Sequence, residues 1–343
     1  MAEKIRELDT SAEILFFMRE DGKENESVTK QGFQVWTFPT VGFQRHLKNI
    51  ADFSFTTIIS VAKCIKKIKE FKPDKILGTG GYVSFAPALS GMLLKIPTYI
   101  HESNITPGMV TKILSKFGCN ILLNTDETKK YLSANAKTTA VGNPLLSSFD
   151  ISRKDARKKL GIADADISIV SFGGSGGSET LNNTIISVMN NYSRKNVKIK
   201  HLHATGHKYF ERVKESSPHL VMGVNGCSVV PYIDDMPIRL RAADIVISRC
   251  GAMTLTEIAK CATAAILIPS PNVTDNHQYK NGAFLAEKNA AILVEESDLT
   301  EELLIEKIAL LVGSKEARKA FGERISQTVK HDAETIISKM LIQ

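Results

Sequence analysis

One strand and turn in the second half of the sequence has the residue types that bind an anion. The run Asp244–Ser248 has the length and β-branching of a buried parallel strand, and Arg249-Cys250-Gly251 breaks it before a helix expected near Met253. The first N–H groups of a helix lack partners within it, so they favour an anionic ligand. The carboxylate of Glu257 can accept hydrogen bonds from vicinal hydroxyls, such as those of a ribose. The spacing Thr254-x-x-Glu257 also fits a capping box that would serve only the helix.

Two further glycine turns follow apolar strands. Strand 167–172 leads into Gly173-Gly-Ser-Gly-Gly-Ser178 and then a helix over 179–191, and Gly78-Thr79-Gly80-Gly81-Tyr82 closes a strand in the first half. Glycines let the backbone approach a phosphate closely, and Ser175 adds a hydroxyl donor. The 173–178 turn is neither a P-loop nor a dinucleotide fingerprint, because it lacks the Lys-Ser/Thr and the glycine spacing. Three such turns, divided between two halves, predict a ligand-binding cleft.

Alternating strands and helices predict an α/β fold with two parallel sheets. The expected strands are 14–18, 33–38, 75–79, 97–101, 119–124, 138–141, 167–172, 198–204, 227–230, 244–248, 264–268 and 290–294. A boundary is expected near Gly142-Asn143-Pro144, before a charged helix that begins at about residue 152. We therefore predict one domain over residues 1–145 and another over 146–343, since open parallel sheets bind ligands at the carboxyl ends of their strands.

Length and composition indicate a cytoplasmic enzyme of two domains. The 343 residues exceed the ~250–300 at which single cores usually stop growing. No stretch approaches the ~18 apolar residues of a membrane-spanning helix, and the first residues lack the apolar segment of a signal peptide. The five cysteines (Cys64, Cys119, Cys227, Cys250 and Cys261) show no C-x-x-C pair. They predict buried, small apolar side chains and no metal site.

The net charge of +7 is concentrated between Val41 and Lys75, where eight basic residues stand against three acidic ones. The eight are Arg45, Lys48, Lys63, Lys66, Lys67, Lys69, Lys72 and Lys75. Apolar residues lie among them; Ile58, Val61, Ile65 and Ile68 share one helical face and are expected in the core. Phe53, Phe55 and Ile59 lie off that face and suit either an anionic membrane surface or a solvated basic helix. Nucleic acid is a poor alternative, because no recognised binding motif accompanies the charge.

An ordered set of motifs resembles the MurG family of glycosyltransferases from about residue 12 to the last helix. The motifs are Lys72-Pro73-Asp74, Gly78–Ser84, His101-Glu102-Ser103-Asn104, Pro107-Gly108, Gly142-Asn143-Pro144, Gly173–Gly177, Asn182, Tyr232–Met236 and 248–283. The resemblance implies two Rossmann-like domains of the GT-B architecture, the first facing the acceptor and the membrane and the second binding a UDP sugar. It also implies that a final helix over 315–340 packs back on the first domain.

The same resemblance implies an activity and its partners. It implies inverting transfer of N-acetylglucosamine from UDP-GlcNAc to the muramoyl C4 hydroxyl of an undecaprenyl-pyrophosphoryl-linked acceptor, without a cofactor. This chemistry belongs to peptidoglycan synthesis at the cytoplasmic face of the cell membrane, where the protein would be peripheral. The alternatives are a transferase with another lipid acceptor such as diacylglycerol, a UDP-GlcNAc epimerase, and a UDP-sugar-binding protein without catalysis.

Site residues carry over from the resemblance position by position. Ile233 would contact the uracil through its backbone, Glu257 would hold the ribose, and His277 with Gln278 would contact the sugar hydroxyls. The full substrate-binding set is Asn104, Ser175, Ile233, Ala252, Met253, Thr254, Leu255, Thr256, Glu257, His277 and Gln278. Pre-aligned donors in this set, the Ser175 loop and the amides of residues 252–254, would stabilise the departing diphosphate. Gly78, Thr79, Gly80, Gly81 and Tyr82 would form the loop for the acceptor diphosphate.

The sequence departs from the family pattern in two places. Family members begin with a strand and a glycine loop that ends in histidine, whereas Met1–Leu8 is expected to form the last turns of the first helix. Without that strand, two strand edges of the first sheet would be exposed, and His101 and Glu102 are the remaining candidates for the general base. An arginine that follows Gly-Asn-Pro in the family is replaced by Leu145 and Leu146, so Arg249 is considered as a substitute.

Overall fold

The computed structural model describes the fold of residues 1–22, 24–40, 50–195 and 199–343, and their side chains except those of 50–54 and 193–195. The chain divides into two compact units. Unit 1 comprises Met1–Pro144 with Asp332–Gln343, and unit 2 comprises Leu145–His331. The division falls one residue before the predicted boundary, and the last helix is grouped with unit 1.

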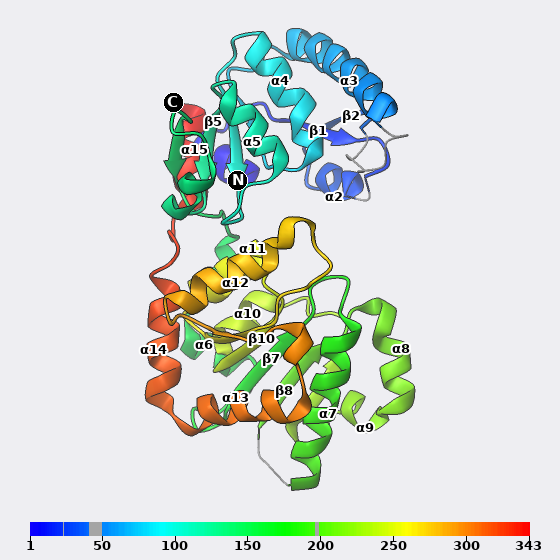
Figure 1. Ribbon diagram of the computed structural model, residues 1–343, viewed down its shortest axis with the longest axis vertical. Coiled ribbons are helices and arrows are strands. Elements are labelled where there is room, and N and C mark those ends of the chain that lie inside the picture. Colours follow the sequence, from blue (N-terminus) through cyan, green and yellow to red (C-terminus); the bar gives the residue numbers. More distant parts are fainter. Residues whose placement is uncertain (23, 41–49, 196–198) are drawn as a thin grey trace. The chain divides into compact units, whose positions relative to one another are not determined.

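Unit 1 contains two parallel sheets (Figure 1). One sheet pairs β1 (Leu15–Arg19) with β2 (Gln34–Phe38); the other has the order β3 (Ile76–Gly78), β4 (Thr98–Glu102), β5 (Asn120–Leu123) and β6 (Thr138–Ala140). Among the described strands, β1 and β3 therefore each pair on one side only. The helices are α1 (Ala2–Leu8), α2 (Asn25–Lys30), α3 (Ile50–Phe71), α4 (Phe85–Leu93), α5 (Met109–Lys116) and α15 (Ala333–Ile342).

The alternation of side chains along β4 divides the core of unit 1 between the two faces of its sheet. Ile100 is fully buried and packs with Ala88 of α4 and Leu114 of α5. Its neighbour Tyr99 packs with Ile337 of α15. Figure 1 shows α15 beside the N-terminal part of the chain, where it contacts α1.

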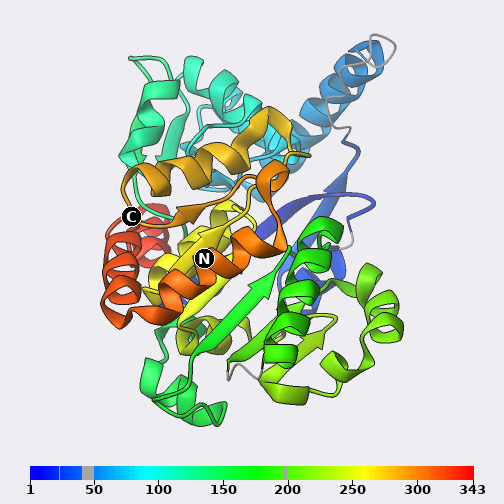
Figure 2. The same ribbon diagram turned by 60° about the horizontal axis from the view of Figure 1, so that its bottom comes forward.

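Unit 2 is a doubly wound fold around one six-stranded parallel sheet of order β12-β11-β10-β7-β8-β9 (Figures 1 and 2). The strands are β7 (Ser168–Phe172), β8 (Lys200–Ala204), β9 (Cys227–Val230), β10 (Ile245–Ser248), β11 (Ala264–Leu267) and β12 (Ile292–Leu293). The helices are α6 (Arg153–Lys159), α7 (Glu179–Lys195), α8 (His207–Ser216), α9 (Pro218–Val221), α10 (Met236–Ala242), α11 (Ala252–Cys261), α12 (His277–Glu287), α13 (Glu301–Gly313) and α14 (Lys315–Ser326). The strand order reverses between β7 and β10, which is where such sheets bind ligands.

Two hydrophobic clusters cover the two faces of this sheet. Ile245 and Ile247 of β10 pack with the cluster that contains α7 and α13, whereas Val246 packs with α10, α11 and α14. The turned view of Figure 2 shows the green and yellow strands of unit 2 between these helices. The continuous burial of β7, β10 and β11 explains why apolar runs rather than an alternating pattern marked these strands.

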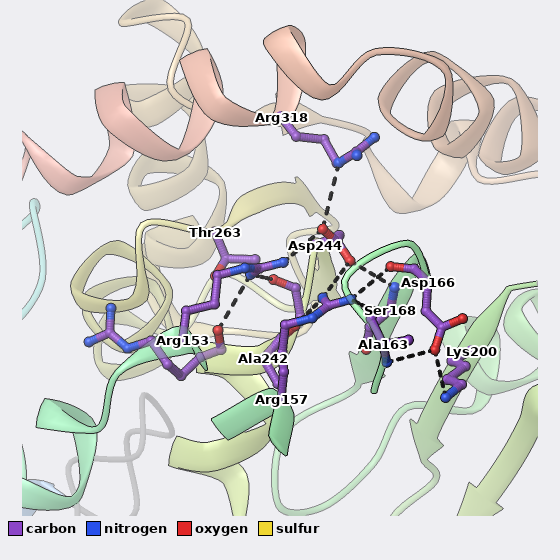
Figure 3. Close-up of polar contacts among 12 residues, drawn as sticks. Arg153, Arg157, Ala163, Asp166, Ser168, Lys200, Ala242, Asp244, Thr263 and Arg318 are labelled. Atoms are coloured by element: carbon purple, nitrogen blue, oxygen red, sulfur yellow. Dashed lines mark hydrogen bonds and ion pairs between the residues drawn. The ribbon is translucent and has the colours of Figure 1, made fainter. Parts of the chain in front are cut away.

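The amino end of the sheet is held by one carboxylate and three arginines (Figure 3). Asp244 accepts hydrogen bonds from Arg153 Nη2 at 2.7 Å, Arg157 Nη1 at 3.1 Å and the backbone N–H of Ser168 at 2.9 Å. Arg318 Nε of α14 lies 3.8 Å from the same carboxylate. Arg157 also donates to the carbonyl oxygens of Ala242 and Asp166. This Asp244 cluster ties α6 and α14 to the starts of β7 and β10.

The structure confirms the α/β architecture, all twelve expected strands and the five buried free cysteines. Two expectations outside the candidate site were wrong. The single helix expected over 315–340 is α14 and α15, separated at residues 327–332, because the Thr328 hydroxyl and amide both bond to the carbonyl of Ile325 and end the helical pattern.

No described helix is long and apolar enough to cross a membrane.

The second correction concerns α3. Ile58, expected in the core, is 67% exposed. The buried stripe of the helix is formed by Val61, Cys64 and Ile68. Ile58 lies about 120° around the helix from Cys64, at roughly 100° per residue, so it faces away from that stripe. Phe55 is also exposed, while Ile59 is partly buried; Phe53 lies among the residues whose side chains are not described.

Candidate functional site

The glycine turn after β7 forms one wall of a cavity of about 400 Å³ in unit 2. The cavity lies beyond the carboxyl ends of the strands, and its lining is predominantly polar. It is lined by Gly173, Gly177, Ser178, Glu179, Thr180, Tyr209, Arg249, Ser270, Asn272, Gln278 and Glu296. Within the turn, Gly174 and Gly177 have φ of 86° and 72°, a conformation that favours glycine. Ser175 is exposed at the tip, so its hydroxyl and the neighbouring amides are accessible to a ligand.

The helix after β10 begins earlier than the sequence suggested. Its N-cap is Gly251, without a side-chain cap, and Ala252 is its first residue. Thr254 is therefore inside the helix, and the capping-box interpretation of Thr254 and Glu257 is wrong. The amides of Ala252, Met253 and Thr254 occupy the first turn, where N–H groups lack acceptors within the helix.

Two members of the predicted set have other contacts. The Leu255 amide donates to the Gly251 carbonyl, and the Leu255 side chain is buried in the core. The Thr256 hydroxyl is also buried and donates to the carbonyl of Ala252. These contacts give both residues a packing role, and the amides of the three residues before them remain the predicted anion-binding groups.

Glu257 carries a partly buried carboxylate near the start of α11. Burial raises its pKa from 4.5 to about 7. Within the described part of the chain, no hydrogen bond or ion pair involves its carboxylate. The protein therefore bears the cost of desolvating this group without a protein donor to offset it, and two ligand hydroxyls could supply the missing hydrogen bonds.

Gln278 and His277 open α12. Gln278 Oε1 accepts hydrogen bonds from the amides of Cys250 at 3.2 Å and Ser270 at 2.9 Å, so it joins the turns after β10 and β11. Its side-chain amide group remains as a donor toward the cavity. His277 Nδ1 donates to the Thr274 carbonyl at 2.8 Å, which leaves Nε2 as an acceptor. The N-cap residue Asn276 makes no side-chain capping bond.

Arg249 is almost fully buried, and its contacts lie within the protein. Nη1 donates to the carbonyl oxygens of Ile268 and Pro269 at 3.2 and 3.0 Å. Nη2 contacts the Ser178 hydroxyl and the Glu296 carboxylate. The guanidinium thus ties the glycine turn to the loops after β11 and β12, and a ligand diphosphate would have to compete with Glu296 for it. Its direct contact with a diphosphate stays a prediction.

Ile233 follows β9 and is 4% exposed. Its side chain packs in the cluster around α10 and α11, so only its backbone could contact a base. Nearby, the ring of Tyr232 stacks on that of His207 with centroids 6.0 Å apart. This exposed stack stands one residue before the position that the resemblance assigns to the uracil.

The predicted acceptor loop in unit 1 joins β3 to α4. Gly80 and Gly81 have φ of 84° and 72°, and a Cβ on Gly78 would lie 2.5 Å from Ile100 Cδ1. Glycine is therefore required in this turn by backbone conformation and by packing. Thr79 is exposed, and the Tyr82 hydroxyl accepts a hydrogen bond from Arg19 of β1 at 3.3 Å. An exposed glycine turn with an adjacent arginine suits an anionic group.

The two general-base candidates are buried at the end of β4. His101 is 3% exposed, and its Nε2 donates to the Gly142 carbonyl at 2.8 Å; burial lowers its pKa. Glu102 is 5% exposed and accepts from the amides of Asn104 and Gly108 and from the Thr111 hydroxyl. The Asn104 side-chain amide donates to the same carboxylate at 3.3 Å. These contacts give Glu102 a role in holding the start of α5.

Sequence reasoning missed several residues that line the cavity. Tyr209 comes from α8, Asn272 from the loop after β11, and Glu296 from the loop after β12. Each lies a few residues beyond the carboxyl end of a strand, the position at which open parallel sheets bind ligands. This position relative to a strand could have indicated these residues as site candidates, but no sequence motif accompanied it.

The chain matches known proteins over both units. The glycosyltransferase family 28 N-terminal domain matches residues 1–122, and the family 28 C-terminal domain matches residues 168–336. A UDP-N-acetylglucosamine--N-acetylmuramyl-(pentapeptide) pyrophosphoryl-undecaprenol N-acetylglucosamine transferase of Acetivibrio thermocellus is 34% identical over 91% of this chain and 84% of its own length. A protein of the same name from Halalkalibacterium halodurans is 35% identical over 96% and 94%.

Solved structures share the fold. The crystal structure of Acinetobacter baumannii MurG superposes with a TM-score of 0.79 at 24% identity, covering 99% of this chain and 93% of that one. A UDP-GlcNAc 2-epimerase from Neisseria meningitidis reaches 0.67 at 14% identity, covering 99% and 94%. At these identities the structures show the GT-B fold alone, whereas the family matches and the curated relatives decide the class. The chain is a glycosyltransferase and belongs to family 28, with the MurG-type N-acetylglucosamine transferases.

Proposed function

We propose that this chain transfers N-acetylglucosamine from UDP-GlcNAc to the C4 hydroxyl of the muramoyl sugar on undecaprenyl-pyrophosphoryl-MurNAc-peptide. The observation that carries the proposal is the grouping of three features at the carboxyl ends of β7 and β10. These are the glycine turn at 173–178, the first-turn amides of α11, and the partly buried carboxylate of Glu257. The names of the relatives specify donor and acceptor.

The donor site performs two tasks in this proposal. Glu257 accepts hydrogen bonds from the ribose hydroxyls, and the backbone of Ile233 contacts the uracil. The amides of residues 252–254 and the Ser175 turn donate to the diphosphate, whose negative charge grows as the bond to the anomeric carbon breaks. His277 Nε2 and the Gln278 amide group contact the sugar hydroxyls. The acceptor oxygen attacks the opposite face of the anomeric carbon, so the configuration inverts.

The acceptor side is proposed to lie in unit 1. The loop Gly78–Tyr82 binds the acceptor diphosphate through its exposed backbone and Tyr82. Of the two base candidates, His101 keeps an accepting ring nitrogen, since Nε2 donates to Gly142 and Nδ1 has, among the described residues, only the Ser103 hydroxyl at 3.5 Å. The carboxylate oxygens of Glu102 already accept four hydrogen bonds. We therefore favour His101, whose replacement by alanine should lower kcat by about 10²–10⁴ if it is the base.

Transfer of radiolabelled N-acetylglucosamine from UDP-GlcNAc to a short-chain lipid acceptor tests the proposal. We expect a labelled lipid product that bears the sugar on the muramoyl unit. Incubation with UDP-GlcNAc alone should yield no epimerised nucleotide sugar. Transfer to diacylglycerol in place of the muramoyl lipid, epimerisation, or UDP binding without any transfer would each overturn the acceptor assignment and select one of the alternatives.

We further propose that the start of α3 docks on the cytoplasmic face of the cell membrane, where the acceptor lies. Phe55 and Ile58 are 68% and 67% exposed and stand three residues apart, so they share a side of the helix. Lys63, Lys66 and Lys69 are exposed farther along it. Apolar side chains near lysines suit an anionic bilayer, at about 1 kcal/mol per basic residue near the surface. Arg45 and Lys48 lie outside the described residues.

Co-sedimentation with phosphatidylglycerol vesicles tests this docking. The double variant Phe55→Ser/Ile58→Ser should bind the vesicles at least tenfold more weakly than the parent. Phe117, the C-cap residue of α5 in the same unit, is 70% exposed, and its replacement by serine should leave binding unchanged. Equal binding of all three proteins would exclude α3 as the docking surface.

A further inference from the structure

A continuous line of polar side chains crosses the interior of unit 2, apart from the groups that face the cavity. It comprises Ser171 of β7, His201 and His203 of β8, Asn182 of α7, and the backbone of Thr205. All five residues are at most 1% exposed. Buried polar groups cost free energy unless they are paired, and here successive members lie within 2.8–3.0 Å of one another.

The backbone carbonyl at one end determines the direction of every hydrogen bond in the line. The Thr205 carbonyl can only accept, so Asn182 directs its Nδ2 toward it at 2.9 Å and its Oδ1 toward His203. His203 Nε2 must then carry the proton and donate to Oδ1 at 3.0 Å. The Ser171 carbonyl lies 3.1 Å from Nδ1, but a proton on Nδ1 would leave Nε2 and Oδ1 as two facing acceptors.

The remaining protons follow from this tautomer. His203 Nδ1 accepts from the Ser171 hydroxyl at 2.8 Å. The Ser171 oxygen in turn accepts from His201 Nε2 at 2.8 Å. His203 must be neutral for this arrangement because its Nδ1 accepts, and burial lowers the pKa of His201 to about 3 and that of His203 to about 4. The line is thus a directed relay of donors that ends on one backbone oxygen.

That oxygen is a close neighbour of the glycine turn. A Cβ on Gly177 would lie 2.0 Å from the Thr205 oxygen, and a Cβ on Gly206 would lie 2.8 Å from Gly177 Cα. The turn after β7 therefore rests directly on the turn after β8, backbone against backbone. Asn182 contacts both sides of this junction, because its side chain donates to Thr205 and its amide donates to the Ser178 carbonyl at 2.8 Å.

We infer that His203 and Asn182 are positioning residues that hold the 173–178 turn in the geometry that binds the diphosphate of a nucleoside diphosphate. They do not contact the ligand; they hold the Thr205 carbonyl, and through it Gly177, against the cavity. The inference rests on the proposed function, since it assigns that turn to the donor diphosphate. It predicts that damage to the line weakens contacts with phosphate and leaves contacts with the nucleoside intact.

The test compares the binding of UDP and of uridine, measured by calorimetry and by ligand-observed NMR. Asn182→Asp keeps the size of the side chain and the acceptor for His203 but places an oxygen against the Thr205 carbonyl. We expect it to bind UDP at least tenfold more weakly and uridine within twofold of the parent. His203→Leu removes the donor and should show the same change in UDP and uridine binding as Asn182→Asp. His203→Gln can still donate through Nε2 and should restore UDP binding to within threefold.

Tyr192→Phe is the matched control, because Tyr192 is buried on the same helix and its hydroxyl has no hydrogen-bond partner among the described residues. It should bind both ligands like the parent. Equal losses of UDP and uridine binding, unchanged UDP binding in Asn182→Asp, or failure of His203→Gln to restore UDP binding when His203→Leu folds would overturn the inference. A parent that does not bind UDP would instead overturn the proposed function, on which the inference depends.

Discussion

The two ends of the sheet in unit 2 differ in whether their carboxylates have partners within the protein. At the amino end, Asp244 is surrounded by Arg153, Arg157, Arg318 and the Ser168 amide, and the charges are paired within the protein (Figure 3). At the carboxyl end, the carboxylate of Glu257 has neither a hydrogen bond nor an ion pair within the described chain, and its pKa is raised to about 7. The same strands connect the Asp244 cluster, whose charged groups are paired, to the carboxyl end, where the carboxylate of Glu257 lacks a partner among the described residues.

This difference separates two kinds of buried charge. A carboxylate with several donors is held in place by them, and removing it leaves those donors unpaired. A carboxylate without donors destabilises the empty protein and gains its partners only when a ligand binds. Substitutions at the two ends should therefore change stability in opposite directions.

The largest effect is expected at the amino end. Asp244→Ala removes the carboxylate that pairs with the buried Arg157 and with the more exposed Arg153 and Arg318, and it should lower the free energy of unfolding by about 3–5 kcal/mol. Urea unfolding followed by circular dichroism measures the change. Lys200→Gln is the control, because the pair of Lys200 with Asp166 is solvent-accessible, and such pairs contribute about 0–1 kcal/mol. Similar losses in both variants would contradict the special role of the Asp244 cluster.

Glu257→Gln should change stability in the opposite direction. The folded protein holds the Glu257 pKa above its unfolded value, so the carboxylate costs nothing at pH 4 and its cost grows as pH rises from 4.5 to about 7. At pH 8 the variant should be more stable than the parent by about 1–3 kcal/mol and should bind UDP about tenfold more weakly. Thermal unfolding at several pH values and calorimetry with UDP test both statements. Glu287→Gln, at an exposed position of α12, should change neither.

A smaller effect should come from His201 and His203, which lie between the two ends. Their folded pKa values of about 3 and 4 are below the unfolded value of 6.5. The unfolded chain therefore binds protons that the folded chain does not, and stability should fall as pH drops from about 6.5 toward 4. At pH 5.5 the expected loss is about 1 kcal/mol per histidine. The melting temperature across this range measures it, and His331→Gln at an exposed site should leave the slope unchanged.

The smallest effect concerns the cysteines. Burial raises the pKa of Cys64, Cys250 and Cys261 to about 12 and that of Cys119 and Cys227 to about 11. Ellman's reagent at pH 8 should therefore label the native chain far more slowly than the unfolded chain. Cys250 borders the carboxyl-end site, so rapid labelling of that residue would show that this end opens in the absence of ligand.

The sequence predicted the helices and strands more accurately than it predicted the contacts between their side chains. Short apolar runs marked most of the strands, and the central strands β7, β10 and β11 are buried throughout, as expected for parallel strands that are covered on both faces. The start of α11 was placed near Met253 instead of Ala252, since Gly251 caps the helix without a side-chain signal. This error allowed Thr254 and Glu257 to be considered a capping box. Ile58 was assigned to the core because a helical period identifies an apolar face but does not fix which side of the helix packs against other elements; in α3 the buried side is centred on Cys64.

The polar interior could not be predicted in the same way. The Asp244 cluster joins residues from α6, β7, α14 and the loop before β10, and no local spacing shows that they meet. The line of His201, Ser171 and His203 did leave a signal. His201 and His203 occupy alternate positions in β8, on either side of Leu202, and alternate positions face the same side of a sheet. The partner residue is set by register, which pairs Ser171 with His203 and follows only from the fold.

The order of strands in unit 2 also constrains how the chain folds. The turns after β7 and β10 become neighbours only when these two strands pair, and the hydrogen bond from Ser168 to Asp244 spans 76 residues of sequence. Closing a loop of that length costs entropy before native contacts can offset the cost, and strand pairing at such a separation slows folding. The proposed donor site should therefore form after β8 and β9 have joined β7. Nucleotide cannot stabilise earlier folding intermediates, and it should slow unfolding rather than accelerate folding.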